Sequence, residues 1–252
     1  MTRNRLRWWQ PPIVMAVGAV GGYYLGGVVA VALPLGIELG DPLNPKGPII
    51  VDGFLQGGLL LAVLVSALLI SRMTPAELGL CRPDLSDLGA PGWAAAAVAL
   101  AGVALVSANS LSAPAQVTVL GFGVSLTLVA FCFVFAFLGP LAEEVAFRGY
   151  LYPGVRSMLP VAAAVVISGL IFGAALAYRG YPLSLLAVLA GLGICWNVLR
   201  ERTDSIVPGL VLHGAMNALV LVGLTAQPGV SLATFAALLA ACGLACLVRP
   251  PA

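Results

Sequence analysis

The sequence predicts an all-α protein that crosses a membrane about eight times. Hydrophobic residues make up 61% of the 252 residues and charged residues 9%, whereas soluble domains carry about a quarter charged residues. The apolar residues are grouped in runs of about 20, the length at which a helix spans the hydrocarbon core. We therefore expect a single transmembrane domain over residues 1–252, surrounded by membrane lipid and with no nucleic-acid partner.

Eight apolar runs separated by polar or turn-forming segments define the expected spans. They are Pro12–Leu35, Pro48–Ile70, Gly92–Leu111, Gly121–Leu138, Met158–Tyr178, Pro182–Leu199, Ile206–Thr225 and Val230–Val248.

The distribution of basic residues orients these spans. With the N-terminus inside, only Lys46 and Arg179 of the 12 basic residues fall outside, as expected because cytoplasmic loops collect Lys and Arg. Both termini are thus expected to be cytoplasmic. The preference for Arg over Lys and the abundance of Ala and Gly favour a bacterial plasma membrane.

The second span carries Asp52 and Gln56 one helical turn apart, near its outer end. Charge near the membrane interface costs little, so we interpret them as interfacial residues, with a functional role as the less favoured alternative.

The fourth span leads into the most unusual stretch, GPLAEEVAFRGY at 139–150. Gly139 and Pro140 predict a broken fourth helix that restarts at Leu141. In the restarted helix, Glu144 and Arg148 are spaced for an i, i+4 ion pair, which leaves Glu143 on another face. Charged groups in an apolar protein are expensive, so this segment is the first candidate for a functional site, and Glu143 is the candidate general base.

The seventh span contains His213 and Asn217, again one turn apart on one face. Alone, they could be interhelical hydrogen-bonding residues. Together with a carboxylate base, they are the donors needed to polarise an amide and stabilise its oxyanion.

The order of these motifs resembles the CAAX protease and bacteriocin-processing family of intramembrane proteases, also called the Abi or type 2 CAAX prenyl endopeptidase-like family. EEVAFR at 143–148 resembles its EExxxR motif, and HGAMN at 213–217 resembles HxxxN. ISGLIFGAAL at 167–176 and LAGLG at 189–193 lie between them, as in the family.

The resemblance implies a family-like core over residues 120–225 that carries the polar site. By that likeness Glu143 activates water, Glu144 and Arg148 form a supporting ion pair, and His213 with Asn217 lies on the oxyanion side. The implied partner is a membrane-associated or lipidated peptide or protein substrate.

One position departs from the family pattern. The second motif, FxxxH, starts at Phe172, but Leu176 stands where its histidine would be, and His213 is the only histidine of the chain. Losing a proton-transfer partner typically costs about 10²- to 10⁴-fold in rate. Tyr150, Tyr178 and Arg179 are candidates to substitute for it.

Two functions follow from these motifs. The first is an intramembrane endopeptidase, which the leucine at position 176 would impair, and the alternative is a non-catalytic pseudoprotease that binds or scaffolds a membrane partner. A proton- or ion-coupled transporter ranks third, because the two halves of the chain show no repeat.

No cofactor is clearly predicted. A divalent metal such as Zn²⁺ is poorly supported, because Glu143, Glu144 and His213 are at most three ligands, one of them engaged with Arg148, and the chain has no HExxH motif.

Overall fold

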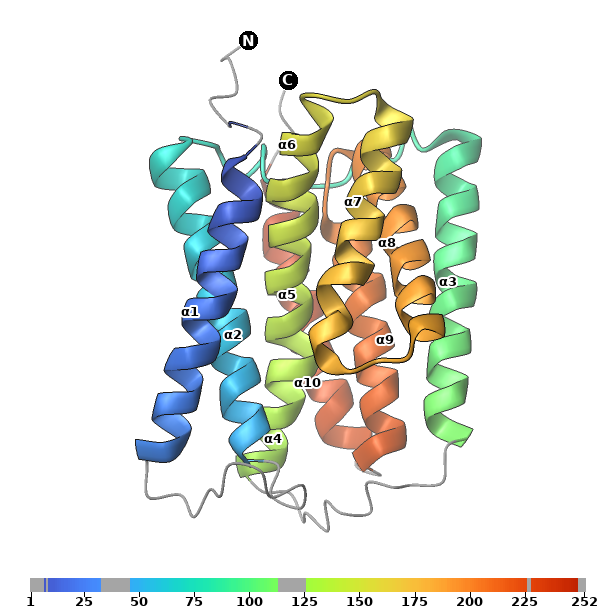
Figure 1. Cartoon of the computed structure of the whole chain (residues 1–252). Helices are drawn as coiled ribbons and strands as arrows, with labels where there is room; N and C mark the ends of the chain where they lie inside the picture. Colours follow the sequence, from blue (N-terminus) through green and yellow to red (C-terminus); the bar gives the residue numbers. More distant parts are fainter. Residues whose placement is uncertain (1–6, 8, 33–45, 113–125, 226–227, 249–252) are drawn as a thin grey trace.

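The computed structural model describes residues 7, 9–32, 46–112, 126–225 and 228–248, and the regular structure in these ranges is helical (Figure 1). The helices are α1 (Gln10–Ala32), α2 (Lys46–Leu64), η1 (Val65–Ile70), α3 (Gly89–Ser112), α4 (Leu126–Phe133), η2 (Val134–Leu138), α5 (Gly139–Glu144), η3 (Val145–Leu151), α6 (Tyr152–Arg156), α7 (Val161–Ala175), η4 (Leu176–Arg179), α8 (Leu183–Thr203), α9 (Val207–Thr225) and α10 (Pro228–Ala245).

These elements confirm the predicted fold class, an all-helical integral membrane protein. Within the described residues, 6 helices are long and apolar enough to cross a membrane, and two shorter apolar helices lie within α9 and α10. The long helices are Gln10–Ala32, Ile49–Ile70, Gly89–Val106, Leu128–Arg156, Val161–Arg179 and Leu183–Thr203. Large apolar side chains such as Leu69 and Leu183 are exposed on the outer surface of the bundle, as expected for a protein surrounded by lipid.

The predicted break in the fourth helix is wrong. Residues 126–156 run as one continuous helix, in which Gly139 keeps right-handed helical torsions, φ −59° and ψ −58°. The π-helical turn η2 precedes Pro140, and the Gly139 N–H bonds to the Val134 carbonyl five residues back. This wider turn accommodates a residue that has no N–H to donate, so the helix continues past Pro140.

The continuous helix moves the acidic segment from the end of a span into its middle. Glu143, Glu144 and Arg148 lie inside the helix 128–156 and are buried. Arg148, which the charge distribution assigned to the cytoplasmic side, is 1% exposed.

The helix that contains α5 runs through the middle of the bundle (Figure 1). It packs against α2 and α9, while α1 packs closely on α2 and α7 on α8. Gly18 allows the first of these close approaches, because a Cβ there would lie 2.8 Å from the Gly58 carbonyl oxygen. The glycine face of the first span therefore contacts α2 of the same chain.

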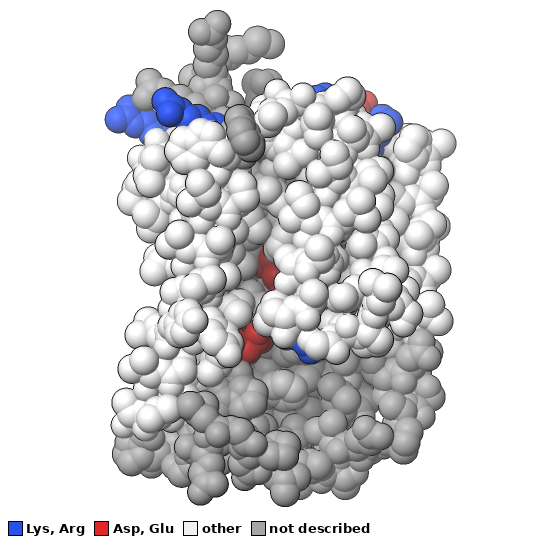
Figure 2. Space-filling model, in the orientation of Figure 1, with Lys and Arg blue, Asp and Glu red and all other residues white. Residues whose placement is uncertain are grey.

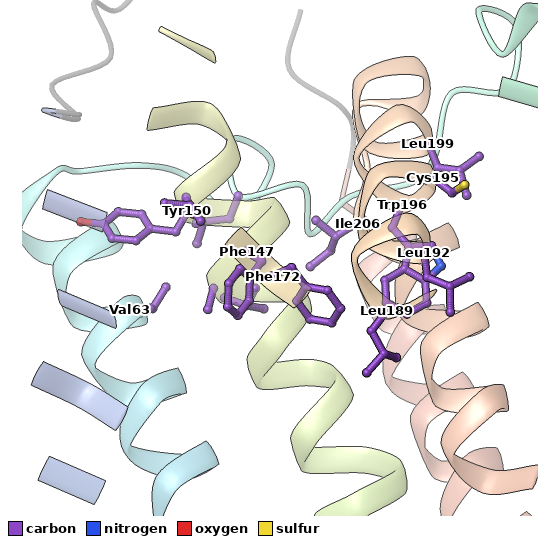
Figure 3. Close-up of a cluster of buried hydrophobic side chains, with 14 of the residues drawn as sticks. Val63, Phe147, Tyr150, Phe172, Leu189, Leu192, Cys195, Trp196, Leu199 and Ile206 are labelled. Atoms are coloured by element: carbon purple, nitrogen blue, oxygen red, sulfur yellow. The ribbon is translucent and has the colours of Figure 1, made fainter. Parts of the chain in front are cut away.

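The main apolar core surrounds η3 of the acidic helix and joins it to α2 and α8. Figure 3 shows Phe147 beside Phe172, with Val63 on one side and Leu189 on the other. The two phenylalanine rings meet edge to face, with centroids 5.1 Å apart. This packing fixes η3 against α7 at the level of the charged residues.

Candidate active site

The predicted ion pair between Glu144 and Arg148 is present and fully enclosed. Arg148 Nη1 lies 3.0 Å from Glu144 Oε1, and the side chains are 1% and 0% exposed. Arg148 also donates from Nη2 to the Gly193 carbonyl at 3.4 Å.

Aromatic rings complete the surroundings of the Arg148 guanidinium. Its central carbon lies 4.2 Å from the Phe172 ring centroid and 5.0 Å from that of Trp196. Cations are attracted to aromatic faces, most strongly when both groups are removed from water. The three side chains come from η3, α7 and α8, so the cation joins three helices.

The same indole ring holds His213. Trp196 stacks on the imidazole with centroids 4.7 Å apart and planes 19° apart. His213 Nδ1 lies 3.1 Å from Glu144 Oε1, so the carboxylate of the ion pair also orients the imidazole. This contact leaves Nε2 pointing to the other acid, 3.7 Å from Glu143 Oε2.

Glycine on α9 lets the histidine helix approach. A Cβ at Gly209 would lie 2.9 Å from Glu144 Oε2. Gly193 in the LAGLG segment has a similar role on α8, because a Cβ there would lie 3.0 Å from the Phe172 ring. The small residues between the polar motifs thus allow the helices to close around the ion pair.

Glu143 faces a different set of groups from Glu144. Its Oε1 accepts a hydrogen bond of 2.9 Å from the Gln56 amide of α2 and lies 3.8 Å from Arg179 Nη2. Its Oε2 faces His213. The residue is buried, and the contacts with α2, η4 and α9 converge on its carboxylate.

Asn217 has a structural partner that the sequence did not suggest. Its Nδ2 donates a hydrogen bond of 2.7 Å to the Phe135 carbonyl. In η2 the Gly139 N–H bonds to Val134, and Pro140 has no N–H to offer, so the wider turn leaves the Phe135 carbonyl in need of a donor. An Asn amide nitrogen carries two hydrogens, and this bond uses one.

Two cavities meet at Glu143 and Leu176. A small polar cavity of about 50 Å³ is lined by Glu143, His213, Asn217, Asp52 and Arg179, among others. It is large enough for water, which needs roughly 10–15 Å³. A groove of about 810 Å³ runs between α1, α2 and α7 and is mainly apolar. Among the residues that the structure describes, only Glu143 and Leu176 line both cavities.

The groove reaches the outer surface of the bundle. Figure 2 shows acidic atoms, with basic atoms close to the lower ones, in a recess part-way along this face, and Glu143 lines the groove. The apolar walls include Met15, Leu59 and Ile171. The groove therefore connects the Glu143 carboxylate with the outer surface of the bundle.

Leu176, in place of the motif's histidine, gives the small cavity an apolar wall. The guanidinium group of Arg179 lies one helical turn further along the chain. Leu176 is buried and separates the two cavities. Arg179 points to Glu143 and forms an ion pair of 2.9 Å with Asp52. Tyr150 instead pairs with Ser66, at 2.7 Å between the hydroxyl oxygens.

Asp52 and Gln56, interpreted from the sequence as interfacial residues, contact the charged groups of the candidate site. Gln56 is 1% exposed and bonds to Glu143, while the Asp52 side chain is 23% exposed and bonds to Arg179. Two signals could have identified this group. Asp52 and Gln56 share a helix face, and Arg179 follows Phe172 at i+7 and Leu176 at i+3, on the same face.

The side chains at this site do not fit a metal ion. Within the ranges that the structure describes, there is no group of three or more His, Cys, Asp or Glu residues arranged to hold one. Glu144 is bound to Arg148, and two guanidinium groups lie beside the acids, which disfavours a divalent cation.

The arrangement has the parts of a hydrolytic site that uses side chains alone. A buried carboxylate lies beside a cavity that fits water, and an imidazole faces it across 3.7 Å. General-base catalysis requires a carboxylate within reach of a water, and oxyanion stabilisation requires a donor on the far side of the reacting carbonyl.

Comparison with known proteins finds one family to which this region is similar. Residues 125–219 match the family model described as type II CAAX prenyl endopeptidase Rce1-like. No curated protein and no solved structure matches the chain. The matched range includes Glu143, Arg148, Leu176 and His213, so the family resemblance inferred from the motifs is confirmed: residues 125–219 are similar to the Rce1-like type II CAAX prenyl endopeptidase family.

Proposed function

We propose that the protein is an intramembrane endopeptidase in which Glu143 activates a water molecule to hydrolyse a peptide bond of a membrane-associated substrate. The observation that carries this proposal is the position of Glu143, which lines both the polar cavity and the apolar groove. A carboxylate at that junction can meet water from one side and substrate from the other.

In the proposed reaction, Glu143 Oε2 takes a proton from water, and the resulting hydroxide attacks the carbonyl carbon of the peptide bond. The carbon–nitrogen bond then breaks, and the proton held by Glu143 goes to the leaving amine. Water is the only co-reactant, so atoms and charge balance.

His213 is placed on the oxyanion side of the proposed reaction. Its Nδ1 lies 3.1 Å from Glu144 Oε1, and that contact orients the ring. Its Nε2 faces Glu143 Oε2 across 3.7 Å, at the cavity in which the reacting carbonyl would lie. The second amide hydrogen of Asn217, which also lines the cavity, is a further donor.

The groove supports a lipidated or membrane-embedded peptide as substrate. Its volume of about 810 Å³ lies within the range of sites for large apolar ligands, roughly 300–1,000 Å³. Basic residues gather at the end of the bundle where α1 begins (Figure 2), which favours a cytoplasmic location for that end and for both termini.

Cleavage of prenylated and non-prenylated CAAX-type peptides by purified protein in liposomes tests the proposal. Glu143→Gln keeps the shape and removes the base, so turnover is expected to fall by at least about 10²-fold. The matched control is Asp87→Asn, which removes an exposed acid outside the bundle and should leave turnover unchanged. Equal turnover by wild type and Glu143→Gln would contradict the mechanism.

Leu176 favours one alternative, a pseudoprotease that binds such a peptide without cutting it. In that case wild type would show saturable peptide binding and no cleavage, and Glu143→Gln would bind as wild type does.

A further inference from the structure

Arg179 lies between two carboxylates that come from different parts of the chain. Its Nη2 is 2.9 Å from Asp52 Oδ1 and 3.8 Å from Glu143 Oε1. Asp52 is on α2, Glu143 on α5 and Arg179 at the end of η4, so three helices meet at this cation.

The turn that carries Arg179 is stabilised by its backbone. Gly180 adopts a left-handed conformation, φ 70°, and its N–H bonds to the Ala177 carbonyl. The next helix starts after Pro182, whose carbonyl accepts the first hydrogen bonds of α8. The turn therefore has a defined structure without the Arg179 side chain, although that side chain is only 19% exposed.

The position of the cation gives Asp52 and Arg179 opposite electrostatic effects on Glu143. A positive charge near a carboxyl group favours its ionised form, and a negative charge disfavours it. Asp52 also holds Arg179 in its own ion pair, which keeps the guanidinium at 3.8 Å from Glu143 and out of hydrogen-bond contact. A base that is not directly ion-paired retains more of its affinity for a proton.

We propose that Asp52 and Arg179 are positioning residues that set the basicity of Glu143, with Arg179 keeping it ionised and Asp52 preventing Arg179 from binding it directly. This inference deepens the proposed function and rests on it. It assigns to the turn after α7 the support of the base that Leu176 cannot give.

The other charged or titratable groups around Glu143 are the same in all variants of the test. They are Glu144, Arg148, Tyr178, Tyr181 and His213. A change in pH dependence on substitution of Asp52 or Arg179 can then be assigned to the removed charge.

The test is the pH dependence of kcat/KM for peptide cleavage in liposomes by Asp52→Asn and Arg179→Gln. Arg179→Gln should move the acid limb to higher pH by about one unit or more, because the ionised base loses its cation. Asp52→Asn should move the limb to lower pH, because a negative neighbour is removed and Arg179 can close on Glu143. In both variants kcat should fall more than KM changes.

A second readout on the same variants does not depend on activity. The infrared carboxyl band that titrates with pH and disappears in Glu143→Gln reports the protonation of Glu143 directly. Its midpoint should shift in the same two directions as the acid limb. Arg179→Lys, which keeps the charge, should move it less than Arg179→Gln does.

Two further variants guard against effects on folding. The double variant Asp52→Asn with Arg179→Gln removes both charges together, leaves no unpaired ion, and should give a midpoint between those of the single variants. Arg156→Gln removes a half-exposed partner of Glu201, 3.4 Å away and outside the cluster, and should leave both readouts unchanged.

The outcomes separate this inference from the proposed function. Opposite shifts support it, including opposite infrared shifts in a protein that cleaves nothing, which would refute only the endopeptidase. Shifts in the same direction, or no shift in a protein whose cleavage depends on Glu143, would overturn the inference and leave the endopeptidase standing.

Discussion

The ion pair between Glu144 and Arg148 should stabilise the fold only when both residues are present, so removing one should cost more stability than removing both. Both side chains are buried, so Arg148→Met leaves an uncompensated carboxylate and Glu144→Gln an uncompensated guanidinium. Breaking a buried pair in this way costs about 3–5 kcal/mol. The double variant leaves no unpaired charge and loses mainly the contacts of the cation with Phe172 and Trp196, worth about 2 kcal/mol when desolvated.

Reversible unfolding in mixed micelles, followed by helical circular dichroism against increasing denaturing detergent, measures these losses. The double variant should be more stable than either single variant. The control pair is Arg156 and Glu201, whose side chains are 41% and 28% exposed, so each of its single variants should lose at most about 1 kcal/mol. Additive losses of about 6–10 kcal/mol in the double variant would refute the reasoning, because they would mean that neither charge depends on the other.

Three further predictions concern helix packing, the side-chain hydrogen bond of Asn217, and position 176, where the family motif has a histidine. Gly173→Ala should lose about 1–3 kcal/mol in the same unfolding assay, because the new Cβ would meet the α8 backbone at 2.9 Å; Gly191→Ala, where nothing lies within 4 Å, is the matched control. Asn217→Ala should lower the free energy of unfolding by about 1–3 kcal/mol, because the Phe135 carbonyl loses its side-chain donor; a loss below about 0.5 kcal/mol would contradict this. Leu176→His places an imidazole on the wall of the polar cavity beside the base, so peptide turnover should rise, by up to about 10²-fold; unchanged turnover in a folded variant would argue against a proton-transfer role at this position.

The contacts that the sequence predicted correctly are those within one helix. The i, i+4 spacing of Glu144 and Arg148 predicted their ion pair, and the same spacing placed His213 and Asn217 on one face, where both line the small cavity. Helical periodicity is enough for such contacts, because neighbours on a helix are fixed by its geometry.

The contacts between helices were not predictable from the same reasoning. Gln56 and Glu143 are 87 positions apart, and Asp52 and Arg179 are 127 apart. Each residue alone has the pattern of an interfacial polar group, and only the packing of α2 beside α5 and η4 shows that they share a partner. The sequence alone therefore does not show whether a polar residue near a helix end faces the membrane interface or a buried cluster, because that depends on which helices pack beside it.

The continuous fourth helix explains why the candidate site lies within a membrane span, beside the apolar groove. A helix broken at Pro140 would have placed Glu143 in a segment after the span, close to the aqueous interface. The π-helical turn η2 keeps the helix intact, and Asn217 of α9 satisfies the carbonyl that this turn releases. The same hydrogen bond joins α9, which carries His213, to the helix that carries Glu143. The π-helical turn thus determines the depth of the base and helps fix its distance from the imidazole, so Asn217 contributes to the geometry of the site through the backbone as well as by lining its cavity.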